Sequence, residues 1–510
     1  MHGSIDKLRR SAKALRKSFA AAEAEALARV RAVLPQATAL RHADALHVIA
    51  REQGHASWPK LKFAAEAAAM SRAERAQRLA VALYFGQGWV VDALLTETPD
   101  LGRDSLGLAC ALYDADHVRA VLARDPAAAT RAEGARRPIL HLAFSQHHRA
   151  GGDAADMLAV ANALLAAGAD VNDSYCHDGD PNAPLSALYG ALGHAGNMVL
   201  AEWLLDHGAD PNDGESLYHA TELGHRDGLR LLLRHGARPE ATNALPRALD
   251  FNDHKAVQLL LEAGADPNEG VAPHPSGEPP FVIPALHQAA RRLCDGPMID
   301  LLLKAGADPS ARYKGQTPYA LARIFGNAPA ARRIAAAGGD TTLTPQEALL
   351  AAAADDTVPP GACIDPETLA GDCRVLPRLM MHLPGRLDQI RRLVALGLEP
   401  DRPDAMGLPP VQIAGWEGLP EAMAFFLSLG PDLGHINGYG GDLLSTIIHG
   451  SENCPAAETR DHIACARLAL EAGVPLLRRA IDYAGAPDMA GFLADWAEAH
   501  PHQVTEGGVG

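Results

Sequence analysis

The sequence has few aromatic residues and no long apolar run. Phe, Trp and Tyr make up 5% of the 510 residues, and the chain is instead rich in alanine, which favours slim, closely packed helices. No uninterrupted stretch of about 18 apolar residues is present, which excludes a hydrophobic helix spanning a bilayer. The basic N-terminus lacks the apolar segment and cleavage site of a secretory signal. These absences predict a cytoplasmic protein without membrane insertion.

Paired cysteines and catalytic motifs are also missing. The seven cysteines are scattered, odd in number and form no CxxC pair, which excludes a zinc site of that type and favours reduced thiols. The patterns GxxxxGK[ST], HExxH and GxSxG are absent. We therefore expect no cofactor and no enzymatic activity.

Positive charge is scarce outside the N-terminal segment. The formal net charge is −16, yet residues 1–62 alone carry a net +7. The acidic remainder excludes broad contact with phosphate backbones, so nucleic acid is not the expected partner. The basic segment is interpreted as a solvated face or as docking on the acidic body; contact with nucleic acid through it is the alternative.

What the sequence does contain is one repeated phrase: leucines, two variable residues, then Gly-Ala-Asp, often followed by Pro-Asn. Clear copies are LLAAGADVN at 164–172, LLDHGADPN at 204–212, LLEAGADPN at 260–268 and LLKAGADPS at 302–310. The leucines suit an apolar helix face, and each glycine stands where the chain turns with positive φ beyond the helix. The predicted turn glycines are Gly168, Gly208, Gly236, Gly264, Gly306 and Gly397.

A second phrase precedes each leucine run by about twenty residues and is predicted to open the first helix of a pair. Its copies include PALHQAA at 284–290 and TPYALARIFGN at 317–327, where Thr317-Pro318 reads as a helix N-cap followed by a first-turn proline. Together the two phrases resemble the ankyrin repeat, a β-turn plus two antiparallel helices in about 33 residues. The resemblance covers roughly residues 76–495. It implies an all-α ankyrin-repeat solenoid of about 9–11 irregular repeats with an N-terminal helical cap.

The phrases also predict a domain organisation. We expect an N-terminal helical segment (1–72), a first ankyrin block (73–340), an irregular joint (341–378), a second ankyrin block (379–500) and a disordered tail (501–510). The segment with Gly54, Ser57, Trp58, Pro59 and Leu61 resembles a motif at the head of bacterial ankyrin proteins, and the stretch 437–454 resembles a repeat from such proteins. Both resemblances imply a bacterial protein, and Trp58 is interpreted mainly as a packing anchor.

Two insertions, 171–183 and 269–283, fall between a helix end and the next helix start, where ankyrin proteins project finger loops. Long loops on a rigid scaffold commonly carry binding residues. Trp416 is placed at the end of a first helix, on the concave side. The predicted partner-binding residues are Tyr175, His177, Asp178, Asp180, His274, Phe281 and Trp416.

Two groups of residues contain side-chain types that could bind a metal ion or catalyse a reaction. Asp170, Asp173, His177, Asp178 and Asp180 contain metal-ligating residue types, but turn formation explains them better. In a second group, His449 could assist a nucleophile at Ser451 with Asn453 nearby, although a histidine bonded to a turn is the commoner role.

The resemblance implies a protein-protein interaction scaffold or adaptor. Its partner would be a protein, and a basic one suits the acidic body. The alternatives are an enzyme or small-molecule binder with a pocket near residues 341–378, and nucleic-acid contact through the N-terminal segment. The sequence leaves the oligomeric state open.

Overall fold

The protein is described by a computed structural model that covers residues 2–176, 184–270, 282–369 and 371–505. The chain divides into two compact units. The terminal unit comprises residues 1–65, 323–326 and 342–510, so it joins the two ends of the chain. The central unit comprises residues 66–322 and 327–341. Each unit is described by itself below.

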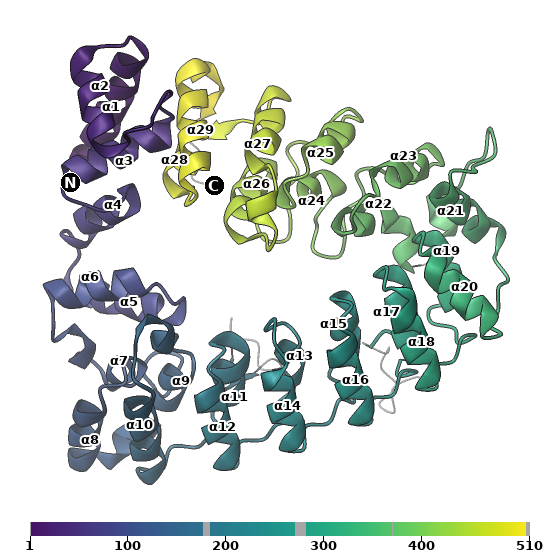
Figure 1. Cartoon of the computed structure of the whole chain (residues 1–510), viewed down its shortest axis with the longest axis horizontal. Helices are drawn as coiled ribbons and strands as arrows, with labels where there is room; N and C mark the ends of the chain where they lie inside the picture. Colours follow the sequence, from purple (N-terminus) through teal and green to yellow (C-terminus); the bar gives the residue numbers. More distant parts are fainter. Residues whose placement is uncertain (1, 177–183, 271–281, 370, 506–510) are drawn as a thin grey trace. The chain divides into compact units, whose positions relative to one another are not determined.

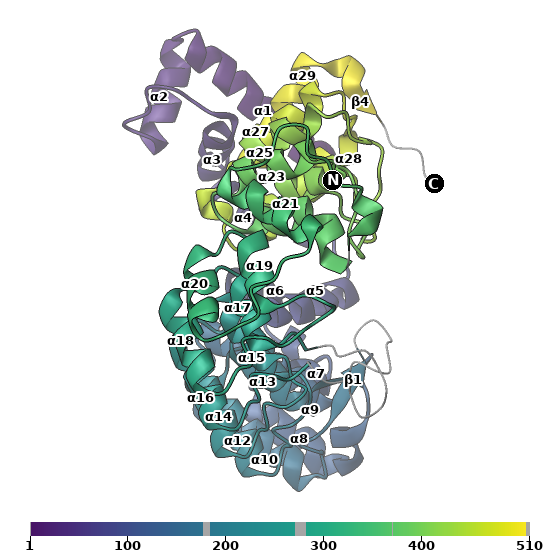
Figure 2. The same cartoon turned by 90° about the vertical axis from the view of Figure 1, so that its right-hand side faces the viewer.

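The central unit is a stack of helix pairs, as the repeated phrases predict. In Figures 1 and 2 the first helices of the pairs line the inner side of its bend and the second helices line the outer side. The first helices are α5 (Arg72–Tyr84), α7 (Leu106–Ala111), α9 (Pro138–Ala143), α11 (Ala187–Tyr189), α13 (Ser216–Ala220), α15 (Ala244–Asp250), α17 (Ala285–Arg291) and α19 (Pro318–Ile324). The second helices are α6 (Gly88–Glu97), α8 (Ala115–Arg124), α10 (Ala154–Ala166), α12 (Met198–Asp206), α14 (Asp227–Arg234), α16 (His254–Glu262), α18 (Gly296–Lys304) and α20 (Ala328–Ala336).

The second helices share one start signal and one buried position. An Asp or Asn side chain accepts a hydrogen bond from a backbone N–H of the first turn in six of them, at Asp114, Asp153, Asn197, Asp253, Asp295 and Asn327. This satisfies donors that a helix N-terminus otherwise leaves unpaired. The first leucine of the repeated phrase is at most 1% exposed at Leu164, Leu204, Leu232, Leu260 and Leu302. The phrase therefore supplies the core of each repeat.

The turns after the second helices confirm the prediction made for the glycines. All six have positive φ, from +87° at Gly236 to +110° at Gly397. The asparagine of the phrase then links neighbouring repeats: Asn268 donates to the carbonyl of Gly306 (2.9 Å) and accepts from the Asp308 N–H (2.7 Å). Asn172 makes the same pair of bonds with Gly208 and Asp210. The phrase thus ends one helix and fixes the next repeat.

A short antiparallel hairpin marks the first insertion. Strands β1 (Ser174–Cys176) and β2 (Pro184–Ser186) pair with Tyr175 opposite Leu185. This confirms a β-hairpin finger at the base of the insertion. After α11 the chain continues into a π-helical turn, Gly190–His194, a local widening that is often found at functional sites.

The terminal unit contains the N-terminal helices and a second series of helix pairs. At the N-terminus are α1 (His2–Ala20), α2 (Ala24–Val33), α3 (His42–Glu52) and α4 (Trp58–Ala67), the last of which crosses into the central unit. The C-terminal part contains α21 (Pro345–Asp355), α22 (Leu376–Leu379), α23 (Leu387–Ala395), α24 (Pro410–Trp416), α25 (Pro420–Leu427), α26 (Leu443–Asn453), α27 (His462–Glu471), β3 (Leu476–Leu477), α28 (Arg478–Tyr483), α29 (Pro487–Ala499) and β4 (Val504–Thr505). Strands β3 and β4 are parallel.

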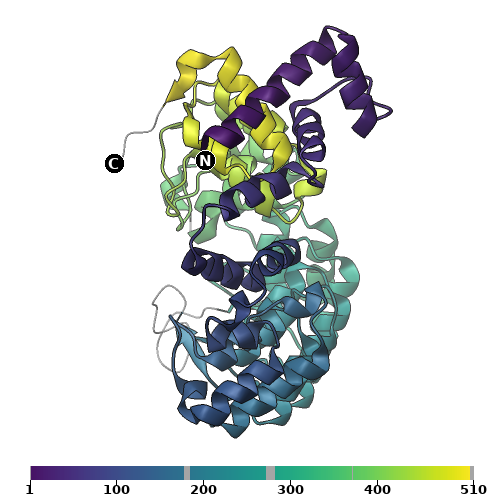
Figure 3. The same cartoon turned by 90° about the vertical axis from the view of Figure 1, so that its left-hand side faces the viewer.

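The two ends of the chain meet within the terminal unit. Figures 1 and 3 show the N-terminal helices (purple) beside the C-terminal helices (yellow). Arg16 of α1 pairs with Asp495 of α29, and Lys13 lies 3.3 Å from Glu498. The basic segment therefore docks on an acidic helix, as one interpretation of the sequence had it. Trp58 packs against the core of α1–α3, which fits its interpretation as an anchor.

No helix among the described residues combines the length and the apolar character needed to cross a membrane.

Candidate functional site

The inner face of the central unit carries aromatic side chains near the C-terminal ends of several first helices. Tyr84, Phe144, Tyr189, Tyr218 and Phe251 occupy these positions on or directly after α5, α9, α11, α13 and α15. Because each repeat contacts its neighbours, equivalent positions lie next to one another in a row. The rings of Tyr84 and Phe144 stack at 6.0 Å, and those of Phe144 and Tyr189 are also 6.0 Å apart. We call these five residues the aromatic row.

Part of this row is open to solvent. Phe251 is 51% exposed, and Phe85, whose ring lies 4.9 Å from that of Tyr84, is 62% exposed. Exposed rings on a rigid curved surface are typical of protein-binding faces, where aromatic residues are enriched.

At one end of the row, rings surround the guanidinium of Arg136. The Cζ atom lies 4.8 Å from the ring centroid of Tyr84, 5.6 Å from that of Phe144 and 5.2 Å from that of Tyr175. Arg136 stands on a tight loop closed by a hydrogen bond from the Glu133 N–H to the Arg136 carbonyl (2.8 Å). These four side chains form what we call the Arg136 cluster.

Two further residues hold this cluster in place. His194, on the π-helical turn, bonds the carbonyl of Tyr84 through Nε2 (2.9 Å), and its ring lies 4.0 Å from the Tyr84 ring. Gly190 has no side chain because a Cβ there would meet the Phe144 ring at 2.5 Å. Burial raises the pKa of Tyr175 and raises that of Tyr189 to about 12. Both phenols are therefore neutral at physiological pH.

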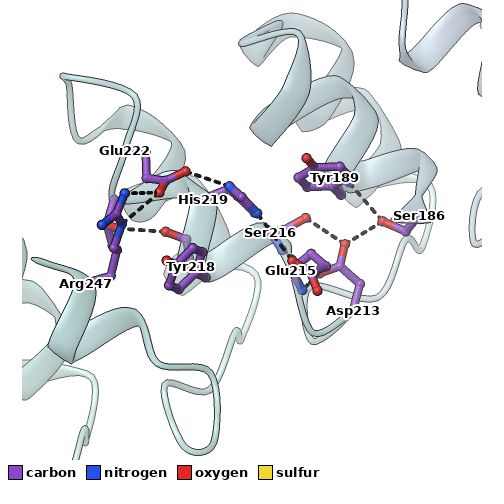
Figure 4. Close-up of polar contacts among 10 residues, drawn as sticks. Ser186, Tyr189, Asp213, Glu215, Ser216, Tyr218, His219, Glu222 and Arg247 are labelled. Atoms are coloured by element: carbon purple, nitrogen blue, oxygen red, sulfur yellow. Dashed lines mark hydrogen bonds and ion pairs between the residues drawn. The ribbon is translucent and has the colours of Figure 1, made fainter. Parts of the chain in front are cut away.

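The middle of the inner face is an ion-pair network (Figure 4). His219 of α13 lies between two glutamates, with Nδ1 2.7 Å from Glu222 Oε2 and Nε2 3.3 Å from Glu215 Oε2. Arg247 of α15 donates to Glu222 Oε1 from Nε (2.7 Å) and to Asp250 from Nη1 (2.8 Å). The network thus bridges successive repeats through alternating charges.

The electrostatics of the network follow from these pairs. Burial alone would lower the pKa of His219, but its hydrogen bond to Glu222 and the charges of Glu222 and Glu215 raise that pKa above its ordinary value. For Glu222, burial acts to raise the pKa, while bonds from His219 and Arg247 bring it below the usual range. Most charge in the middle of the inner face is therefore balanced internally.

The finger turn of the next repeat is tied to this face by Asp213 (Figure 4). Its carboxylate accepts hydrogen bonds from the hydroxyls of Ser186 (2.5 Å) and Ser216 (2.6 Å). The Ser186 hydroxyl in turn accepts from the backbone N–H of Tyr189 (2.9 Å). This arrangement positions Tyr189 but leaves no free nucleophile, since each hydroxyl donates to a carboxylate.

A groove runs along α5 at the same end as the Arg136 cluster. It has a volume of about 700 Å³ and is walled by one face of α5 and by α7. A smaller cavity of about 20 Å³, lined by Tyr84, Arg136 and Phe144, adjoins it and shares Ala80, Leu108 and His141 with it. The groove is lined by Arg72, Ala73, Ala76, Gln77, Ala80, Asp104, Ser105, Leu108, Glu133 and His141.

Of the predicted binding residues, Tyr175 lies in the Arg136 cluster. His177, Asp178, Asp180, His274 and Phe281 lie outside the described residues. Trp416 ends α24 in the terminal unit, as expected, and its ring lies 5.2 Å from that of His449 on α26. Its role in binding stays a prediction.

The candidate metal-binding group and the candidate catalytic group both form hydrogen bonds or ion pairs with neighbouring residues. Asp173 pairs with Arg137 (2.6 Å), and Asp170 accepts from the Asn172 N–H (2.9 Å). Within the described part of the chain no group of three or more His, Cys, Asp or Glu is arranged to hold a metal ion. The Ser451 hydroxyl donates to the Ile448 carbonyl (2.6 Å), and His449 contacts the Asn453 amide (3.0 Å). His449 therefore does not activate Ser451 in this arrangement.

Sequence reasoning missed Arg136, the His219 network and one further surface. The finger turns of the terminal unit expose Met406 (46%), Ile436 (57%) and Tyr439 (71%), and the Gly438 N–H donates to the Met406 carbonyl (2.9 Å). Apolar residues inside polar, glycine-rich turns were the available signal for this last group. Arg136 gave no such signal.

The comparison with known protein families agrees with this architecture. A family model described as ankyrin repeats, in three copies, matches residues 188–271. Among solved structures the chain is similar to the crystal structure of the human ASB11 ankyrin repeat domain, with 17% identity, 49% of this chain and 96% of that chain covered, and a TM-score of 0.23. No curated protein sequence matches the chain.

The stacked helix pairs and their linked turns define a repeat protein with an all-α fold. Residues 188–271 of the chain are ankyrin repeats. Ankyrin repeats are in general protein-protein interaction modules, and proteins built from them are typically not enzymes.

Proposed function

We propose that the chain is an interaction scaffold that binds a partner protein through the inner face of its central unit. The observation that carries the proposal is the series of side-chain contacts from Tyr84 to Phe251, beside the groove along α5. In this series His219 connects Tyr189 to Tyr218, and Arg247 connects Tyr218 to Phe251. A surface of this kind buries apolar area on binding while the stacked backbone keeps its shape. The finger loops at 171–183 and 269–283 would extend the same interface.

The net charge of −16 supports a basic partner, because opposite charge raises the rate of encounter. Lys13 and Arg16 of the basic N-terminal helix are paired with carboxylates of α29. These two positive charges are therefore not available to nucleic acid, which argues against nucleic acid as the partner. A cytoplasmic site of action stays a prediction. The five-part domain division, the joint at 341–378 with a pocket for a small molecule, and the part of Trp416 in binding stay predictions.

Site-directed photo-crosslinking in the native cell tests the proposal. A benzophenone amino acid replaces Gln77, an exposed residue of the groove, or Val199, which is 48% exposed on the second helix α12. We expect one protein to be crosslinked in stoichiometric yield from position 77 and not from position 199. Equal labelling from both positions, or none from position 77, would show that the inner face is not the binding surface.

A further inference from the structure

Arg136 differs from Arg247 because no carboxylate among the described residues balances its charge. Three rings surround its guanidinium at 4.8 to 5.6 Å. Among the described residues, none of the Asp or Glu side chains lies within ion-pair distance of it, and its partially buried guanidinium is held by the rings. A guanidinium prefers a planar anion that accepts two parallel hydrogen bonds. The Arg136 cluster therefore holds a guanidinium in position to pair with a carboxylate from another molecule.

Nearby carboxylates have other partners. Glu133, on the same loop, accepts hydrogen bonds from the backbone N–H groups of Leu106 (3.0 Å) and Gly107 (2.7 Å), so it caps the start of α7. Asp173 pairs with the neighbouring Arg137 (2.6 Å). Neither is turned to the Arg136 guanidinium, and moving either would leave backbone donors or another arginine without a partner.

Arg247 shows what a completed site looks like. Its guanidinium also lies over two rings, 5.6 Å from that of Tyr218 and 4.8 Å from that of Phe251. In addition it pairs with Glu222 (2.6 Å) and Asp250 (2.8 Å). No described Asp or Glu side chain takes the corresponding position at Arg136.

The groove leads to this position. Ala76 and Ala80 of α5 line it, and it shares Ala80, Leu108 and His141 with the small cavity that Arg136 lines. At the opposite end of the groove Arg72 is already paired with Asp100 (2.9 Å) and Asp104 (2.5 Å). Among the described lining residues of the groove and the adjoining cavity, Arg136 is therefore the arginine that has no carboxylate partner.

We propose that a peptide segment of the partner lies in the groove along α5 and places an Asp or Glu side chain on Arg136. The proposal rests on the proposed function and specifies the chemistry of the contact. The rings of Tyr84, Phe144 and Tyr175 hold the guanidinium in place, so little side-chain entropy is lost on binding. An acidic anchor on the partner is compatible with a partner that is basic as a whole.

A double-mutant cycle with selected peptides tests the contact. Random dodecapeptides, acetylated and amidated at their ends so that only side chains carry charge, are selected on the full chain. Each selected peptide is then remade with every Asp changed to Asn and every Glu to Gln. We expect one such change to weaken binding by about tenfold in the wild-type chain and to have no further effect in Arg136→Ala.

Two control variants separate the possible failures. Arg124→Ala removes one positive charge from an exposed position on the outer helix α8 and should preserve the tenfold effect. Gln77→Trp fills the groove and should abolish binding of every selected peptide. If acidic residues matter equally in wild type and Arg136→Ala, the carboxylate contact is wrong while the groove stands. If no selected peptide depends on position 77, the groove and the contact both fall.

Discussion

Two arginines of the inner face are packed on aromatic rings in the same way but have different electrostatic surroundings. Arg247 joins two carboxylates and connects α13 to α15. Arg136 contacts three rings and no carboxylate among the described residues. The charge of Arg247 is neutralised within the stack, whereas the charge of Arg136 is available to a carboxylate of a partner. Position on the same surface therefore does not imply the same role.

The difference teaches how one face can serve both stability and recognition. A network whose charges are all paired is costly to disturb, because removing one member leaves others partly buried and unpaired. A cation held by rings can gain a carboxylate without breaking an existing pair. We expect substitutions at Arg247 to act on folding and substitutions at Arg136 to act on binding.

The largest effect should follow from Arg247→Ala. This change takes one of two cationic partners from Glu222, which keeps His219, and from Asp250, which keeps Arg292 (3.0 Å). The side chains of Glu222 and Asp250 are 27% and 14% exposed. The expected loss of stability, from two partly buried carboxylates that each lose one cation, is about 2 kcal/mol. Urea unfolding, with amide hydrogen exchange of α13–α17 to locate the loss, measures it.

Arg230→Ala provides the matched control for that variant. Arg230 pairs with Asp227 on the outer helix α14, where the two side chains are 52% and 72% exposed. Such a surface pair contributes less than about 0.5 kcal/mol. If the two variants lose the same stability, the network around Arg247 is no more than a set of surface pairs.

The variant Gly264→Val, at a turn, provides a reference value for the stability losses of the arginine variants. Gly264 has a φ of +93°, and a Cβ placed there would meet no atom within 4 Å. Any cost of Gly264→Val therefore comes from the backbone conformation alone, and we expect about 2 kcal/mol. A thermal unfolding curve that matches wild type would contradict the assignment of this residue as the helix terminator.

The turns were also the part of the fold that the sequence predicted best. The glycine and asparagine of the phrase act on neighbours a few residues away or in the next repeat, and their chemistry is the same in each copy. Gly168 and Asn172 could therefore be interpreted from the phrase alone, and the structure confirms the glycine's positive φ. Because the phrase recurs, the turn predicted from one copy could be predicted for the other repeats of the central unit.

The inner face could be predicted only in outline. Tyr175 was singled out because it stands in an insertion, yet its contact with Arg136 joins two finger loops about forty residues apart in the chain. The His219 network depends on which helix ends face one another. Such contacts arise from stacking and leave no periodic pattern in the sequence. Arg136 occurs in an ordinary polar turn, RAEGARRP at 131–138, with nothing to mark it.

Arg136→Ala should have a smaller effect on stability than Arg247→Ala. It removes contacts with three rings but leaves no carboxylate unpaired, so the expected loss is under about 1 kcal/mol. The same urea unfolding assay compares the two variants directly. A loss as large as that of Arg247→Ala would mean that Arg136 is also a structural arginine, and the contrast between the two sites would disappear.

The smallest effect, and the finest test of the contrast, concerns two histidines. Burial, together with the charges of Arg136 and Arg149, lowers the pKa of His194 from its ordinary value of 6.5. His219, in the ion-pair network, has a raised pKa. In a 13C-labelled chain, the histidine signal missing from His194→Gln should titrate below pH 6.5 and the one missing from His219→Gln above it.

The consequences for stability have opposite signs. Because the folded-state pKa of His194 is depressed, its contribution is complete above its unfolded value of 6.5 and is lost as the pH falls. The contribution of His219 is complete below that value and is lost as the pH rises through its raised folded-state pKa. Relative to wild type, His194→Gln should thus gain stability as the pH falls, and His219→Gln should gain stability as the pH rises. Shifts in the same direction for both variants would show that the two clusters share one electrostatic environment.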